Sequence, residues 1–334
     1  MTACGRIGFD TGAGAHSELR LDRFDAGEVL IDFPLMLALG PTRVDVDVVA
    51  PDASDLRVYD ASGTVLPVEI EQPSSPIIAW VRVPRIEGTT TTLTLSYGDP
   101  TAPAAVGSTW APSYEGVWHF GTDTLLDSTG KHTATATGTT AAAGFRGGGL
   151  GFDAVAQTFV TIPDAASLDF PTLTLSAMLQ PASSSDLYSG VISRELDDTV
   201  DEDLYLGTYN GNLFAEVYGV EIDTGTTARP AAVDDWHAFA LTYDGSMFRA
   251  YEDGVEFVTL PDPGPPTHPA DPFMFGANRN DRDVTERRDL GDDDFFDGVA
   301  DEIRFDHAVR SPAWIAADAA SLGDAWITYG PIER

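Results

Sequence analysis

The sequence has almost no lysine and little positive charge of any kind. Its 334 residues contain 19 Lys and Arg against 53 Asp and Glu, a formal net charge of −34, and Lys131 is the one lysine. This charge repels nucleic acid and anionic membranes, so neither is expected as a partner. Acidic chains poor in lysine suit concentrated salt, where screening weakens self-repulsion. We therefore expect a protein of a halophile or of its virus.

Cysteine and long apolar runs are also nearly missing. Cys4 stands alone, which excludes an internal disulfide framework and a metal site built from cysteines. No apolar run reaches the roughly 18 residues of a membrane-spanning helix, so we expect no membrane insertion. Residues 1–20 carry no basic segment followed by an apolar one, so the sequence predicts no secretory signal.

Apolar residues are nevertheless plentiful enough for a folded core, at 43% of the chain, with 10% aromatic. Short alternating stretches predict strands, for example at 44–48, 89–97 and 237–243. The Asp-Gly pairs at 244–245 and 253–254 predict hairpin turns. Ser311 as the N-cap and Pro312 at the first helical position predict one short helix near the C-terminus.

The chain changes composition at residues 101–112, which are rich in Ala, Pro, Gly and Ser and predict a linker. Many short strands without helical intervals predict an all-β fold with sheets packed on each other. We therefore expect a small N-terminal β-sandwich domain over residues 1–110 and a larger jelly-roll domain over residues 111–334.

The first domain carries a family resemblance. From Asp55 the sequence reads DLRVYDASGTVLPVEIE, from Ala79 it reads AWVRVP, and from Thr91 it reads TTLTLSYGDPTA. Over residues 20–105 the chain resembles DUF2341, a small β domain of unknown function. The family typically precedes a lectin-like jelly roll, which agrees with the composition of the remaining chain.

The second domain resembles the laminin-G-like or concanavalin A-like jelly roll. Separate blocks in the right order carry this resemblance: VWHF, LLDSTGKH, GGGLGFDAVAQTFVTIPDAASLDF, DDWHAFALTYDGSMFRAYEDGVEF and FDGVADEIRFDHAVRSPAWIAA. Trp118, Trp236 and Trp314 lie inside these blocks, so we expect them in the core. The resemblance defines a fold more than a function, because this sandwich carries many unrelated sites.

The resemblance also implies a structural calcium ion. In such jelly rolls calcium lies between the loop after the first strand and the final strand, and the matching positions here are Asp127 and Asp301. The family's acid after the first Phe is replaced by Gly121, and Asp123 follows two positions later. Calcium takes six to eight oxygen ligands, so three aspartates would meet its charge requirement.

A catalytic set is not visible. Glycan hydrolases of this fold present two carboxylates from a motif of the type E-x-D-x-x-E. The nearest approach, Glu221 with Asp223, lacks the third carboxylate, so we expect no enzyme. A glycan hydrolase or lyase that acts through Glu221 remains an alternative.

The remaining hypothesis is recognition of a glycan. Sugar sites need an exposed aromatic ring beside polar side chains. This pattern gives the predicted ligand-binding residues Tyr188, Tyr205, Tyr209, Asn210, Asn212 and Tyr218.

An adhesive protein without a secretory signal points to a virion surface protein, such as a tail fibre, spike or capsid turret. It would bind a host-surface glycan or glycoprotein and other virion proteins. The alternatives are a structural, assembly or decoration module of a virion, and a secreted, extracellular adhesin. A homo-oligomer is left open, because no heptad or collagen-like stretch encodes one.

Overall fold

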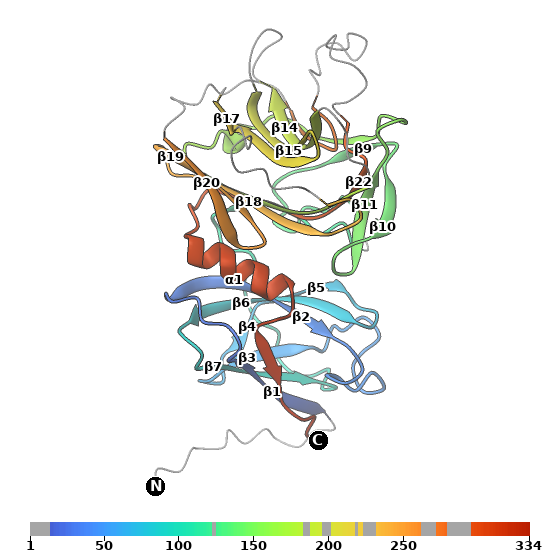
Figure 1. Cartoon of the computed structure of the whole chain (residues 1–334). Coiled ribbons are helices and arrows are strands. Elements are labelled where there is room, and N and C mark those ends of the chain that lie inside the picture. Colours follow the sequence, from blue (N-terminus) through green and yellow to red (C-terminus); the bar gives the residue numbers. More distant parts are fainter. Residues whose placement is uncertain are drawn as a thin grey trace. The chain divides into compact units, whose positions relative to one another are not determined.

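The computed structural model describes residues 14–121, 125–182, 188–195, 202–217, 220–222, 232–261, 272–278 and 295–334 (Figure 1). The chain divides into two compact units, and Pro112–Ile315 form the second. The first contains the residues up to Ala111 together with Ala316–Arg334. The sequence predicts a second domain over residues 111–334, which would include residues 316–334. They belong to the first unit because strand β23 (Ile327–Tyr329) pairs with β1 (Ala15–Leu21).

The described residues of the first unit form two antiparallel sheets, with strand orders β23-β1-β7-β3-β4 and β2-β6-β5. In the first of these sheets alternate residues are buried, such as Leu19 and Leu21 of β1. In the second sheet consecutive residues such as Leu35, Met36 and Leu37 of β2 are buried, so both faces of this strand are covered. The remaining strands are β2 (Leu30–Leu39), β3 (Arg57–Asp60), β4 (Val65–Leu66), β5 (Val68–Gln72), β6 (Ile77–Ile86) and β7 (Thr91–Tyr97).

The strand predicted at residues 44–48 is wrong, because this segment forms turns. The amides of Val48 and Val49 donate to the carbonyl oxygen of Asp45, and the amide of Asp47 donates to the side chain of Asp45. Aspartate side chains offer the backbone such local hydrogen bonds and thereby compete with a strand. Val44 is buried while Val46 is 46% exposed.

The C-terminal segment is fastened within the first unit by a polar cluster. The guanidinium of Arg43 donates to the carbonyl oxygen of Ala38 and to Oδ2 of Asp324, both at 2.6 Å. It also lies over the ring of Tyr329, 4.0 Å from its centroid. Burial raises the pKa of the Tyr329 phenol, so the ring stays neutral beneath the cation.

The second unit is a jelly roll whose described strands form two sheets. One has the order β10-β11-β22-β13-β18-β19-β20, with β8 also paired to β22. Its strands are β8 (Tyr114–Trp118), β10 (Thr140–Ala143), β11 (Gly148–Phe152), β13 (Leu173–Pro181), β18 (His237–Tyr243), β19 (Met247–Glu252), β20 (Val255–Pro261) and β22 (Gly298–Asp306).

The second sheet of this unit has the order β17-β16-β15-β14-β21-β12-β9 among the described residues. All of its strand pairs are antiparallel. Its strands are β9 (Thr135–Thr137), β12 (Phe159–Ile162), β14 (Tyr188–Glu195), β15 (Glu202–Tyr209), β16 (Asn212–Val217), β17 (Val220–Ile222) and β21 (Phe273–Phe275).

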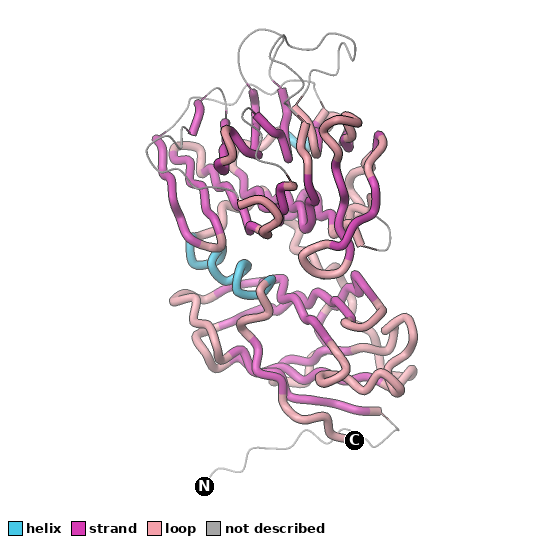
Figure 2. Tube along the Cα trace, turned by 45° about the vertical axis from the view of Figure 1, so that its right-hand side comes forward, coloured by secondary structure: helices cyan, strands magenta, loops and turns pink. Residues whose placement is uncertain are grey.

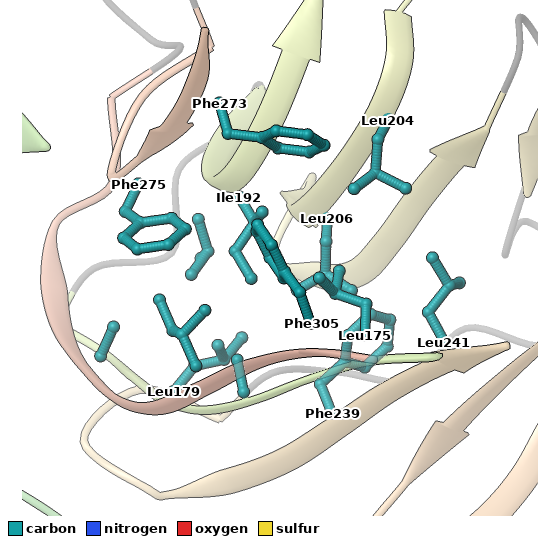
Figure 3. Packing of buried hydrophobic residues seen from close by; sticks show 14 of the residues in the cluster. Leu175, Leu179, Ile192, Leu204, Leu206, Phe239, Leu241, Phe273, Phe275 and Phe305 are labelled. Carbon is teal, nitrogen blue, oxygen red and sulfur yellow. The ribbon is translucent and has the colours of Figure 1, made fainter. Parts of the chain in front are cut away.

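The core of the second unit lies between these two sheets. Phe239 and Leu241 of one sheet and Leu206 and Phe275 of the other point into the same apolar cluster (Figure 3). Trp118 is fully buried there. Of the other tryptophans predicted as core, Trp314 is 6% exposed and Trp236 is half-buried.

Among the described residues, α1 (Pro312–Leu322) is the one α-helix (Figure 2). The hydroxyl of Ser311 accepts a hydrogen bond from the amide of Trp314 at 3.0 Å, which confirms the predicted N-cap. No described helix is long and apolar enough to cross a membrane. The mostly β fold with one C-terminal helix is therefore as predicted.

Candidate functional site

An aromatic cluster lies on the outer face of the sheet that contains β15 and β16. Leu204 and Leu206 of β15 belong to the core between the sheets. Side chains alternate along a strand, so Tyr205 and Tyr209 lie on the opposite face. The same alternation places Phe214 of β16 on that face, because Leu213 and Ala215 are in the core.

The ring of Phe214 contacts both tyrosine rings of this cluster. The rings of Tyr205 and Phe214 lie 5.5 Å apart at 70°, and those of Tyr209 and Phe214 lie 5.7 Å apart at 58°. Tyr205 is 1% exposed and Phe214 is 3% exposed, whereas Tyr209 is half-buried. Tyr209 is thus the ring of the three that reaches solvent, and Phe214 supports it.

Polar groups surround Tyr209 at the end of the hairpin. Tyr209 pairs in register with Tyr188 on one side and with Asn212 on the other. Asn210 and Gly211 form the turn with φ of 50° and 69°, which is the geometry that Asn-Gly favours. Asn210 is exposed. The side-chain amide of Asn212 donates to the backbone carbonyl oxygen of Asn210 at 3.1 Å.

The structure therefore brings several of the predicted ligand-binding residues together. Tyr209, Asn210 and Asn212 share one hairpin end, and the backbone of Tyr188 lies beside them. Tyr205 is too buried to stack on a ligand directly. Tyr218 lies outside the described residues. Sequence reasoning missed Phe214, although its pairing with Gly207 across the Asn210-Gly211 turn follows from the period of two.

Asp127, one of the predicted calcium ligands, organises the loop after β8. Its Oδ1 accepts from the amides of Val117 and Thr129 at 3.0 and 2.9 Å. Its Oδ2 accepts from the amides of Lys131 and His132 at 3.0 and 2.9 Å. The Thr129 hydroxyl lies within 2.9 Å of both oxygens. These donors use the lone pairs that a calcium ion would need.

Asp301, the second predicted ligand, is fully buried and also accepts from amides. Oδ2 receives the amides of Phe145 and Arg146 at 2.9 and 3.3 Å, and Oδ1 receives that of Glu302 at 2.8 Å. Burial and the Glu302 carboxylate raise the pKa of Asp301 well above its usual value. Neither Asp127 nor Asp301 belongs to a described triad of His, Cys, Asp or Glu with ligand atoms within 4.8 Å of one another.

Both described carboxylates thus accept hydrogen bonds from backbone amides and hold their own loops in place. Asp123, the third predicted ligand, lies outside the described residues, so the complete triad stays a prediction. Glu221, the residue of the hydrolase alternative, pairs in register with Glu216. The side chains of both glutamates lie outside the described ones.

The single lysine, which is 38% exposed, pairs with the buried Glu115 in a polar network beside the Asp127 loop. The Glu115 carboxylate receives the Lys131 ammonium at 3.0 Å and the His132 ring at 2.8 Å. Nε2 of His307 lies 3.4 Å from Oε2 of Glu115. Burial raises the pKa of Glu115, but hydrogen bonds from Ser167, Lys131 and His132 outweigh it and hold the pKa below its usual value.

Two known families match this chain. Residues 52–114 match the domain of unknown function DUF2341, and residues 154–316 match Laminin_G_3 of the concanavalin A-like lectin/glucanases superfamily. Both resemblances seen in the sequence are thereby confirmed, in the predicted order. No curated protein matches the chain.

Solved structures resemble the second unit in fold. Domain 4 of AbnA, an extracellular arabinanase from Geobacillus stearothermophilus solved with arabinotriose, has a TM-score of 0.50 at 18% identity, covering 62% of this chain and 98% of that one. The botulinum neurotoxin DC binding domain, solved with rat synaptotagmin II, has a TM-score of 0.46 at 13% identity over 63% of this chain and 52% of its own. Botulinum neurotoxin type C, whose cell entry is described as dependent upon interaction with two ganglioside molecules, gives a TM-score of 0.48 at 13% identity. This match covers 63% of this chain and 51% of the neurotoxin chain. This chain thus spans about half the length of the neurotoxin chains.

Proposed function

We propose that the concanavalin A-like unit is a non-enzymatic module that binds a glycan at the end of the β15–β16 hairpin. The observation that carries this proposal is the exposed edge of the aromatic cluster. Tyr209 offers a ring braced by Phe214. Asn210 and Asn212 place amide groups beside it on a rigid turn.

The chemistry of this arrangement suits a sugar. An aromatic face stacks on the C–H groups of a pyranose or furanose ring, and neighbouring amides pair with its hydroxyls. Asn210 and Asn212 each supply both a donor and an acceptor. A net charge of −34 also favours a neutral or cationic ligand over an acidic one.

Glycan binding by the purified chain in concentrated salt tests this proposal. Arabinotriose is the first probe, because the arabinanase domain of the same fold was solved with it. A broad glycan array and host-envelope preparations follow. We expect Tyr209→Ala to weaken binding of the selected glycan about tenfold, the effect of losing one stacked ring, and Tyr209→Phe to bind nearly as wild type.

Tyr59 of β3 is a matched control, because it is a half-buried tyrosine of the other unit. Tyr59→Ala should leave glycan binding unchanged. If no glycan binds, or if both alanine variants weaken binding equally, recognition at this hairpin is refuted.

We further propose that the protein acts at the surface of a virion that infects a halophile, as a tail fibre, spike or turret component. The acidic, lysine-poor composition supports the saline setting. The combination of a separate N-terminal β unit with a binding module supports attachment to a larger assembly. Mass spectrometry of purified particles tests the location, and absence of the chain from particles overturns it.

An attachment protein should also compete with infection when host cells are saturated with the purified chain. A virion component that fails to compete would instead be a decoration or assembly module. If the chain is found free in the culture medium, the secreted adhesin is the correct description.

A further inference from the structure

Three metal-binding side chains converge where β18 begins and β19 ends, away from the β15–β16 hairpin. His237 is the first residue of β18, Glu252 is the last of β19, and Asp253 starts the turn that follows. Among the described residues, their ligand atoms all lie within 4.8 Å of one another. Strands β18 and β19 lie side by side as neighbours in one sheet (Figure 1).

The local sequence holds all three groups in place. Asp253 and Gly254 take φ of 49° and 79°, which makes the tight turn predicted from their Asp-Gly pair. The Asp253 amide donates to the carbonyl oxygen of Ala238 at 2.8 Å, and its Oδ1 accepts from the Ala238 amide at 3.0 Å. The side chains of His237 and Glu252 are 10% and 12% exposed, so neither is free to swing away.

The imidazole of His237 and the carboxylate of Glu252 face each other directly. Nδ1 of His237 lies 3.1 Å from Oε1 of Glu252, and Nε2 lies 3.4 Å from the carbonyl oxygen of Ala232. A ring nitrogen without a hydrogen and a carboxylate oxygen both carry lone pairs that can coordinate one metal ion.

The spacing suits a metal ion. Two ligands that are each about 2.1 Å from one ion, at an angle of about 95–110°, lie about 3.1–3.4 Å from each other. The Ala232 carbonyl would then orient the ring through its outer nitrogen, as carbonyl groups do for metal-bound histidines. One imidazole and two carboxylates are a donor set for Zn²⁺ or a similar transition-metal ion rather than for Ca²⁺, which prefers oxygen alone.

We propose that His237, Glu252 and Asp253 form a binding site for a divalent transition-metal ion such as Zn²⁺. The three side chains supply one nitrogen and two oxygen ligands, and water completes the coordination. The site is separate from the glycan site and does not depend on it. Its position at the junction of β18, β19 and the next turn means that a bound ion ties together two strands of the sheet.

Calorimetric titration of the full chain with Zn²⁺ tests the proposal, after treatment with a chelator and with excess Mg²⁺ to occupy nonspecific carboxylates. We expect one site whose affinity falls at least about tenfold in Glu252→Gln and in Asp253→Asn. Asn tolerates the positive φ of position 253, so that variant keeps the turn. Zn²⁺ should also raise the Tm of the wild type but not that of Glu252→Gln.

Asp244→Asn is the matched control, because Asp244 starts the other Asp-Gly hairpin of the same sheet and pairs with Arg249. Its Zn²⁺ affinity should equal that of the wild type. If Zn²⁺ binds no more tightly to the wild type than to Glu252→Gln, or if Asp244→Asn weakens binding equally, the site is refuted. A proton shared by His237 and Glu252 is then the correct description.

Discussion

Lys131 allows the sharpest test of the packing in the second unit. A chain that uses arginine everywhere else keeps one lysine, and the ammonium of this residue has three acceptors. It donates to the carbonyl oxygens of Tyr114 at 2.6 Å and Pro112 at 3.4 Å, and to Oε2 of Glu115 at 3.0 Å. A compact ammonium with three hydrogens suits three acceptors that surround one point, whereas a planar guanidinium does not.

The magnitude follows from these contacts. A hydrogen bond to a charged group contributes about 1.5–3 kcal/mol, but the Lys131 side chain is 38% exposed, so solvent screens part of this. We expect Lys131→Met to lower the free energy of unfolding by about 2–3 kcal/mol. Lys131→Arg keeps the charge but loses the geometry, and we expect about 1 kcal/mol.

Thermal and urea unfolding in concentrated salt measure this difference. A loss of 1 kcal/mol corresponds to a drop in Tm of about 2–4 °C in a domain of this size. Arg85→Lys serves as the control, because Arg85 and its partner Glu87 are 56% and 64% exposed and should tolerate the exchange. If Lys131→Arg is as stable as the wild type, the argument from ammonium geometry is wrong.

Three further predictions concern stability. The lowered pKa of Glu115 means that its carboxylate stabilises the fold above the ordinary glutamate pKa and loses this effect as pH falls through the lowered value. Glu115→Gln should therefore flatten the acid side of the stability profile measured by urea unfolding, and an unchanged slope would contradict this. The Asp127→Asn variant keeps one acceptor oxygen, whereas the backbone amides around Asp127 now use two. The free energy of unfolding should therefore fall by about 2–4 kcal/mol. An unshifted urea midpoint would refute the structural role of Asp127. Deleting residues 324–334 removes β23 together with Asp324 and Tyr329, two of the partners of Arg43. Hydrogen exchange should then accelerate in β1 while β13 and β18 stay protected, and equal protection of β1 would show that the C-terminal strand is dispensable.

The sequence by itself established the class of each unit and its local turns. The period of two identified β7 and β18, and Ser311 with Pro312 located the helix, because capping and turn preferences act over a few neighbouring residues. The pattern failed at Val44, Val46 and Val48, where Asp45 supplies local hydrogen bonds that alternation does not reveal. Composition also established the acidic character of the chain.

Only the tertiary structure decided which distant residues meet. Nothing local in residues 327–329 shows that they pair with β1, at the other end of the chain. Burial likewise separates Tyr209, which reaches solvent, from Tyr205, which does not. Strand order brings His237 to Glu252, fifteen positions away. Pairing register and burial depend on contacts across the whole domain, and a short stretch of sequence does not encode them.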